Sequence, residues 1–230
     1  METLAIVANL LVNLWLLIIV HRQCVRKQLP WFASYIAWEV VSGSFELAFW
    51  LSNRPLFPGL YWSFEAVEIA LIVAAVRESF LRMFQGFTTI RGFRWSVWSV
   101  IGGVVIYSVW KAIHVPPLQA SRLGVFVAGA EFLFRWGIAG IALLTAFLSI
   151  RMHESMDTRE HAVVTGFGIA SLAFVLYIGS FSVFPTKYIF LFKYLPTVGY
   201  FLAAFWWIWV FSRPVREFGL KDLGLRREAH

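Results

Sequence analysis

The sequence predicts an all-α integral membrane protein, built as a bundle of seven transmembrane helices. Of its 230 residues, 60% are hydrophobic and only 14% are charged, and the hydrophobic residues gather in seven long runs. A soluble domain is usually about half apolar and about a quarter charged, so a single small core could not bury this much apolar surface. A third observation, the unequal distribution of lysine and arginine between loops, fits spans that alternate in direction.

The length leaves little room beside seven spans. Each span takes about 20 residues, so seven use about 140 and leave about 90 for loops and tails. These numbers exclude an appended soluble domain, a coenzyme-binding fold and a DNA-binding module. We therefore divide the chain into a transmembrane domain, residues 1–212, and a basic cytoplasmic tail, residues 213–230.

The first predicted span is Leu4–Val20. It is longer than the apolar core of a signal peptide, which has about 7–15 residues behind a positively charged start. Here an acidic residue, Glu2, precedes the apolar run and the basic residues follow it. We interpret this segment as a retained first helix.

Six further spans follow in order. Each is a long apolar run, and residues that break helices, such as Pro30, Pro58 and the Pro116–Pro117 pair, mark several of the boundaries. Three glycines in the sixth span suit a membrane helix, because small residues let such helices approach closely. The predicted spans are Trp31–Leu51, Leu60–Arg82, Trp95–Ile113, Leu123–Ile150, His161–Phe184 and Tyr194–Phe211.

Lysine and arginine lie mainly on one side of these spans. The smaller group is Arg54, Lys111, Arg122, Lys187 and Lys193. The larger group is Arg22, Arg26, Lys27, Arg82, Arg91, Arg94, Arg151, Arg159, Arg213, Arg216, Lys221, Arg226 and Arg227. Because basic loops stay in the cytoplasm, we expect the N-terminus outside and the C-terminus in the cytoplasm. The same topology accounts for the net charge of +7 without a nucleic-acid partner.

Polar residues inside the predicted spans are the candidates for a ligand- or ion-binding site. A charged residue at a helix centre costs about 2.5–3.5 kcal/mol on the insertion scale, so it usually faces the interior of a bundle. Within each span, the polar candidate residues are seven, three or four positions apart, so they lie on a common face of the helix. The four-residue spacing in the fifth span suits an ion pair. The candidates are Asn9, Asn13, Glu39, Glu46, Glu65, Glu68, Glu131 and Arg135.

Counting from the predicted boundaries places these residues in an overlapping range of depths. Glu39 is expected in the inner half of the membrane, and the others in the outer half or near the middle. Five carboxylates then face one arginine, so protons, a bound cation or water in an outward-open cavity must neutralise the surplus charge. Alternatively, protonated glutamates hydrogen-bond across the bundle and only fix the helix register.

Several chemistries lack the residues that they need. A microbial rhodopsin requires a lysine in the middle of its last helix, and Tyr194–Phe211 has none. The five histidines lie at span ends or in tails, which argues against intramembrane haem, zinc hydrolysis and histidine-activated nucleophiles. The tryptophans lie mostly toward span ends, which favours interfacial belts over a pigment or sterol pocket. The charged loop 153–161 suggests a solvated turn rather than a metal site. We predict no cofactor, no metal and no enzymatic activity.

The stretch YWSFEAVEIALIVAAVRESF, residues 61–80, resembles a pattern in a family of uncharacterised bacterial multi-helix membrane proteins. The matching positions are Tyr61, Trp62, Glu65, Glu78 and Phe80, within about one helix. The family has no assigned activity. The resemblance implies a multi-pass protein of the bacterial inner membrane in which Glu65 and Glu78 belong to a recurring pattern.

Three functions are consistent with these observations. We expect a receptor-like binding module, whose outward-facing polar site recognises a small ligand or cation and signals to a cytoplasmic protein partner. The first alternative is a cation- or proton-linked channel or transporter component, for which a homo-oligomer is a common arrangement. The second is a structural subunit of a larger membrane assembly. In each case the lipid bilayer is the surrounding partner.

Overall fold

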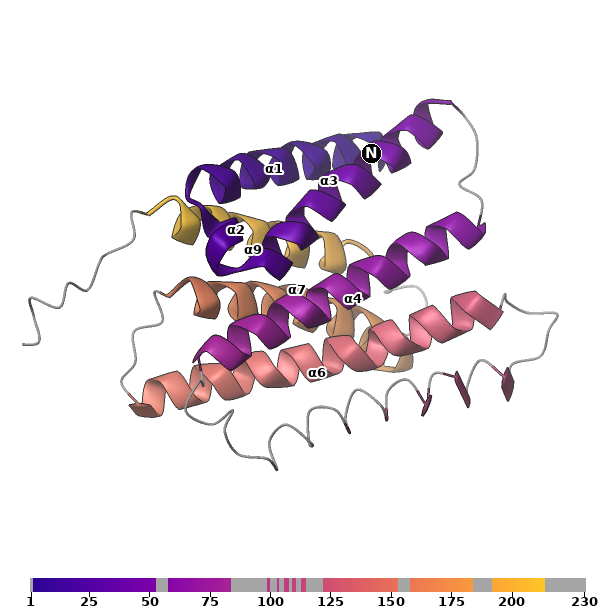
Figure 1. The fold of residues 1–230 in the computed structure, drawn as a ribbon. Helices are drawn as coiled ribbons and strands as arrows, with labels where there is room; N and C mark the ends of the chain where they lie inside the picture. Colours follow the sequence, from indigo (N-terminus) through magenta and orange to yellow (C-terminus); the bar gives the residue numbers. More distant parts are fainter. Residues whose placement is uncertain are drawn as a thin grey trace, which may run out of the picture.

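A computed structural model describes residues 2–52, 58–83, 122–152, 158–183 and 192–213, together with a few single positions between 99 and 114. All the described elements are helices (Figure 1). They are α1 (Glu2–Arg22), α2 (Val25–Gln28), α3 (Pro30–Leu51), α4 (Pro58–Met83), α6 (Arg122–Met152), α7 (Arg159–Val183) and α9 (Leu195–Phe211).

Six of the seven predicted spans correspond to these helices, and their ends differ from the predicted ends by at most two residues. The remaining span, Trp95–Ile113, falls mostly outside the described residues. Four helices are long and apolar enough to cross a membrane, namely α1, α4, α6 and α7, while α9 is a shorter apolar helix. The all-helical class is confirmed, and four of the described helices have the length and apolar composition of membrane spans.

The short helix α2 was not predicted, and it lets the chain turn back between α1 and α3. Cys24 precedes it in the left-handed backbone region, with φ of 52°. Pro30 occupies the first turn of α3, where a missing N–H costs nothing because that turn has no intrahelical acceptor. Val25, at the start of α2, and Leu29, between α2 and α3, are fully buried.

α3 runs opposite to α1 and α4, and five of the helices close a ring (Figure 1). α1 packs on α3, α3 on α4, α4 on α7, α7 on α9, and α9 again on α1. α6 lies outside this ring, against α4 and α7. Figure 1 shows that α1, α4 and α6 begin at the end of the bundle where α3 finishes, whereas α2 lies at the opposite end.

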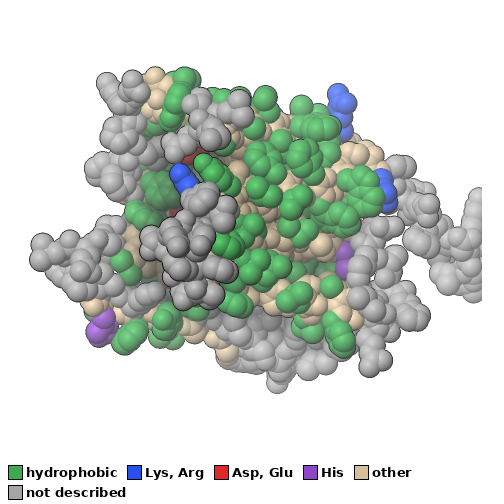
Figure 2. Space-filling model, turned by 180° about the vertical axis from the view of Figure 1, so that it is seen from behind, with side chains coloured by type: hydrophobic (Ala, Val, Ile, Leu, Met, Phe, Trp, Pro, Cys, Tyr) green, Lys and Arg blue, Asp and Glu red, His purple; other side chains and the backbone are tan. Residues whose placement is uncertain are grey.

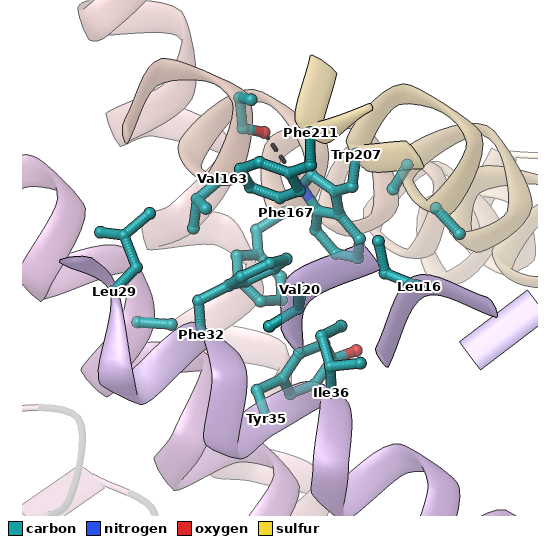
Figure 3. Close-up of a cluster of buried hydrophobic side chains, with 14 of the residues drawn as sticks. Leu16, Val20, Leu29, Phe32, Tyr35, Ile36, Val163, Phe167, Trp207 and Phe211 are labelled. Atoms are coloured by element: carbon teal, nitrogen blue, oxygen red, sulfur yellow. Dashed lines mark hydrogen bonds between the residues drawn. The ribbon is translucent and has the colours of Figure 1, made fainter. Parts of the chain in front are cut away.

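The core of the ring is aromatic at the end that carries α2. Phe32 of α3 contacts Phe167 of α7 and both Trp207 and Phe211 of α9, with ring centroids 5.1–6.2 Å apart. Tyr35 extends the stack, 4.9 Å from Phe167 (Figure 3). All five side chains are at most 2% exposed. Such edge-to-face contacts add to the energy of apolar burial and hold three helices together.

Trp207 departs from the interfacial position that its place near a span end suggested. Its side chain is fully buried, and its indole Nε1 donates a hydrogen bond to the carbonyl oxygen of Ala162, 2.9 Å away (Figure 3). The ring lies directly over Gly166, where a β-carbon would overlap it. Trp31, Trp50 and Trp209, by contrast, are about half exposed, at 50%, 44% and 46%.

Polar contacts tie the helices at the end that carries α2. Glu78 of α4 accepts a hydrogen bond from the backbone N–H of Trp31, 3.1 Å away, in the first turn of α3, and also pairs with Arg82. Arg159, at the start of α7, donates to the Gln23 carbonyl and to the Gln28 side chain. Hydrophobic side chains cover the middle of the face in Figure 2, and the described Lys, Arg and His side chains lie toward its ends.

Candidate functional site

A cavity of about 380 Å³ lies between α1, α3 and α4. The first half of α1, the second half of α3 and the first half of α4 supply its walls, so it occupies the end of the bundle away from the aromatic core. Its lining combines carboxyl, amide and aromatic side chains. The lining residues are Ile6, Asn9, Glu39, Ser42, Gly43, Glu46, Phe49, Trp50, Tyr61, Phe64, Glu65 and Glu68.

A hydrogen-bonded network from three helices forms the floor of the cavity. The hydroxyl of Tyr200 on α9 donates to Asn13 Oδ1, 2.6 Å away, and lies 3.4 Å from Glu39 Oε2. Asn13 Nδ2 donates in turn to Asn9 Oδ1 at 3.2 Å. Asn13 is fully buried, and Glu39 is 8% exposed. The network therefore satisfies polar groups that would be costly to bury alone.

Below this floor the same helices continue directly into the aromatic core. On α3, Glu39 is followed toward the other end by Tyr35 and Phe32, and on α9, Tyr200 is followed by Trp207. These aromatic side chains are buried and in mutual contact. The cavity thus ends at the floor, and large apolar side chains fill the ring beyond it.

The opposite end of the cavity is open and carries acidic and aromatic side chains. Glu46 is exposed, and Trp50 and Tyr61 are 44% and 47% exposed. Tyr61 donates a hydrogen bond from its hydroxyl to Glu65 Oε1, 3.2 Å away and one turn along α4. The mouth therefore presents two carboxyl groups from different helices next to two aromatic rings.

Arg135 connects α6 to the side of the cavity. Its Nε lies 2.8 Å from Glu131 Oε1, which confirms the ion pair expected from the four-residue spacing, and its Nη2 lies 3.7 Å from Glu68 Oε1. The guanidinium also sits 4.9 Å from the ring centre of Phe174 on α7. The guanidinium of Arg135 on α6 therefore interacts with two carboxylates and contacts side chains of α4 and α7.

The structure brings all eight sequence-predicted residues into one connected region. Five of them line the cavity directly: Asn9, Glu39, Glu46, Glu65 and Glu68. Asn13 lies in the floor network, and Glu131 and Arg135 reach the cavity through the ion pair with Glu68. In the described part of the chain, no group of three or more His, Cys, Asp or Glu side chains is arranged to hold a metal ion.

Sequence reasoning missed the tyrosines and most aromatic lining residues. Tyr61 lies four residues before Glu65, so helical spacing could have indicated its contact with that carboxyl group. Tyr200 had no such signal, because its partners Asn13 and Glu39 lie on other helices. Phe64 was equally undetectable in an apolar run, although its ring contacts Trp38 and Phe45 across the α3–α4 interface.

Comparison with known proteins identified no relative of this chain. No family model matches the chain, and neither a curated protein nor a solved structure was found to be similar to it. The cavity and its carboxyl groups are therefore the observations on which a functional conclusion has to rest.

Proposed function

We propose that this chain is a receptor-like membrane module that binds a small cationic ligand in the cavity between α1, α3 and α4. The observation that carries the proposal is a cavity with four glutamates in its walls, closed at one end by buried aromatic side chains. The one basic side chain that pairs with these glutamates among the described residues is Arg135, and Glu131 shares it. A cation in the cavity would offset the surplus negative charge.

The closed floor favours binding over conduction through the bundle. A pore would need a polar path past Tyr35, Phe167 and Trp207, and these side chains are in contact and at most 2% exposed. A pocket with one open end instead fits a ligand that enters and leaves by the same route.

In this proposal the chain has seven spans in the inner membrane of a bacterium, with an outside N-terminus and a cytoplasmic C-terminus. The position of the cavity supports this orientation. It opens at the end of the bundle opposite the one that carries α2, where Arg22, Arg26, Lys27 and Arg82 are exposed. The ligand would then reach the cavity from outside. We expect contact with a cytoplasmic partner through Arg91–Arg94, the loop 153–161 or the basic tail 213–230, and most of these residues lie outside the described ones.

Binding to the purified protein in lipid nanodiscs tests the proposal. We expect K⁺, Ca²⁺, tetramethylammonium or a simple alkylammonium ion to give a saturable calorimetric signal that weakens at least tenfold in Glu46→Gln with Glu65→Gln. Glu160→Gln is the matched control, since Glu160 lies at the start of α7, away from the cavity. If none of these cations, and no diamine, binds in a way that depends on the cavity glutamates, the proposal is wrong.

A transporter component is the second candidate, and one observation favours it. A chain of hydrogen bonds from Asn9 through Asn13 to Tyr200 and Glu39 joins polar groups across the cavity floor, as part of a proton path would. Cation or proton flux in proteoliposomes, altered by Glu68→Gln, would support this reading. A structural subunit would instead keep its assembly when Glu46, Glu65, Glu68 and Arg135 are all neutralised.

A further inference from the structure

We infer that the ligand is an elongated aliphatic dication, a diamine or a short polyamine. One ammonium group binds at Glu39 on the cavity floor, and the other binds between Glu46 and Glu65 at the mouth. This inference rests on the proposed function, because it specifies the chemical class of the cation that the same cavity takes.

The shape of the cavity is the first argument. Along α3 its lining extends from Glu39 to Trp50, which corresponds to about 16 Å at a rise of about 1.5 Å per residue. A volume of about 380 Å³ spread over that length describes an elongated cleft. An elongated cleft accepts an extended chain.

The acidic groups stand at two depths, which is the second argument. Glu39 and Glu46 lie on one face of α3, two helical turns or about 10 Å apart along the axis. Glu39 is 8% exposed, whereas Glu46 is exposed at the mouth, where Glu65 faces the same cavity from α4. Two separated negative positions match two separated positive charges.

Glu39 lies on the floor without a positively charged partner among the described side chains. More than nine-tenths of its surface is buried, and it lines the cavity. The hydroxyl of Tyr200 lies 3.4 Å from Glu39 Oε2. A buried carboxylate without a positive partner is costly, and an ammonium group beside Glu39 would remove that cost. Glu68, at the side of the cavity, already shares Arg135.

The lining also offers apolar surface to methylene groups. Ser42 and Gly43 lie between Glu39 and Glu46 along α3, and the cavity is lined as well by the apolar side chains of Phe64 from α4 and Ile6 from α1. At the mouth, the rings of Trp50 and Tyr61 stand next to Glu46 and Glu65, so the outer ammonium group can contact an aromatic face as well as a carboxylate.

A bare metal ion fits this arrangement poorly. Ca²⁺ takes six to eight oxygen ligands at about 2.3–2.6 Å, which requires carboxylates gathered at one point. The described acidic groups are instead spread along the cleft, and none of their groupings is arranged to hold a metal ion.

Calorimetry with a series of ligands tests the inference. The probes are straight-chain diamines of two to eight carbons, alkylamines of matching length, tetramethylammonium, K⁺ and Ca²⁺, each titrated into the protein in nanodiscs. We expect the best diamine to bind at least tenfold more tightly than its matching monoamine, with an optimum in chain length. Glu46→Gln should reduce the diamine to the affinity of the monoamine, and Glu160→Gln should leave both unchanged.

Two results would overturn the inference in different ways. If a monoamine or an inorganic cation binds as tightly as every diamine and Glu46→Gln weakens it, the ligand is a single-charge cation and only the dication assignment fails. If no cation binds in a glutamate-dependent manner, the proposed function fails too. Glu46 is exposed, so Glu46→Gln should fold even if Glu39→Gln does not.

Discussion

Arg135 on α6 stands between two carboxylates, 2.8 Å from Glu131 on its own helix and 3.7 Å from Glu68 on α4. The three side chains are largely buried, at 16%, 13% and 25% exposed. Glu68 also lines the cavity. The ion pair between Arg135 and Glu68 therefore joins α6 to the wall of the cavity.

Replacing this arginine should destabilise the protein. Arg135→Gln leaves two carboxylates without a cation, and removing one partner of a buried pair typically costs about 3–5 kcal/mol. We expect a lower midpoint of thermal unfolding in detergent, followed by fluorescence-detected size exclusion. Glu68→Gln in the Arg135→Gln background should restore part of the loss, and Arg135→Lys should lose less than Arg135→Gln. Equal stability of Arg135→Gln and the parent protein would contradict this role.

Tyr200→Phe removes the hydroxyl that joins α9 to α1 and α3 at the cavity floor. We expect a loss of about 1 kcal/mol, because Asn13 loses its buried hydrogen-bond donor and Glu39 loses its contact with the same hydroxyl. Cation affinity should fall as well, since the carboxyl group of Glu39 is no longer held in position. The control is Tyr194→Phe, whose ring is 51% exposed just before α9. If the two variants unfold at the same temperature, the floor network contributes nothing to stability.

Gly166→Ala tests the packing of α7 on α9. A β-carbon at this position would overlap the Trp207 ring, whose neighbours Phe32 and Phe167 leave it no space to move. Overpacking of this kind usually costs about 1–3 kcal/mol. Gly140→Ala is the matched control on α6, where a β-carbon would meet nothing within 4 Å. Thermal unfolding should separate the two variants, and a Gly166→Ala protein as stable as the control would refute the packing argument.

Cys24 allows the orientation to be measured in the natural chain. It is the single cysteine, and it is exposed at the end that carries α2, which we propose to be cytoplasmic. A membrane-impermeant maleimide should therefore label permeabilised cells and spare intact ones. In a Cys24→Ser background, Ser52→Cys at the cavity end of α3 should show the opposite pattern. Labelling of Cys24 in intact cells would reverse the proposed topology.

Much of the candidate site could be predicted, because intramembrane polar residues are conspicuous in an apolar chain. The spacing of Glu131 and Arg135 indicated their ion pair, and the spacing of Glu39 and Glu46 indicated a shared face. Such spacings indicate only contacts and shared faces within one helix. They carried no information about Tyr200 or Phe64, whose contacts cross from one helix to another.

The sequence by itself determined the membrane class, the position of six helices and the identity of the polar residues. Apolar runs, proline and glycine act locally, so they can be read without knowing the partners of a segment. Only the tertiary structure decided that α1, α3 and α4 enclose the cavity, that Tyr200 of α9 closes its floor, and that α6 reaches it solely through Arg135 among the described contacts. The physical reason is that lipid tails are as apolar as most helix surfaces, so hydrophobicity alone does not select neighbours. Close contacts, such as that of Trp207 over Gly166, do select neighbours. They depend on the complementary shapes of two helix surfaces, which come together only in the assembled bundle.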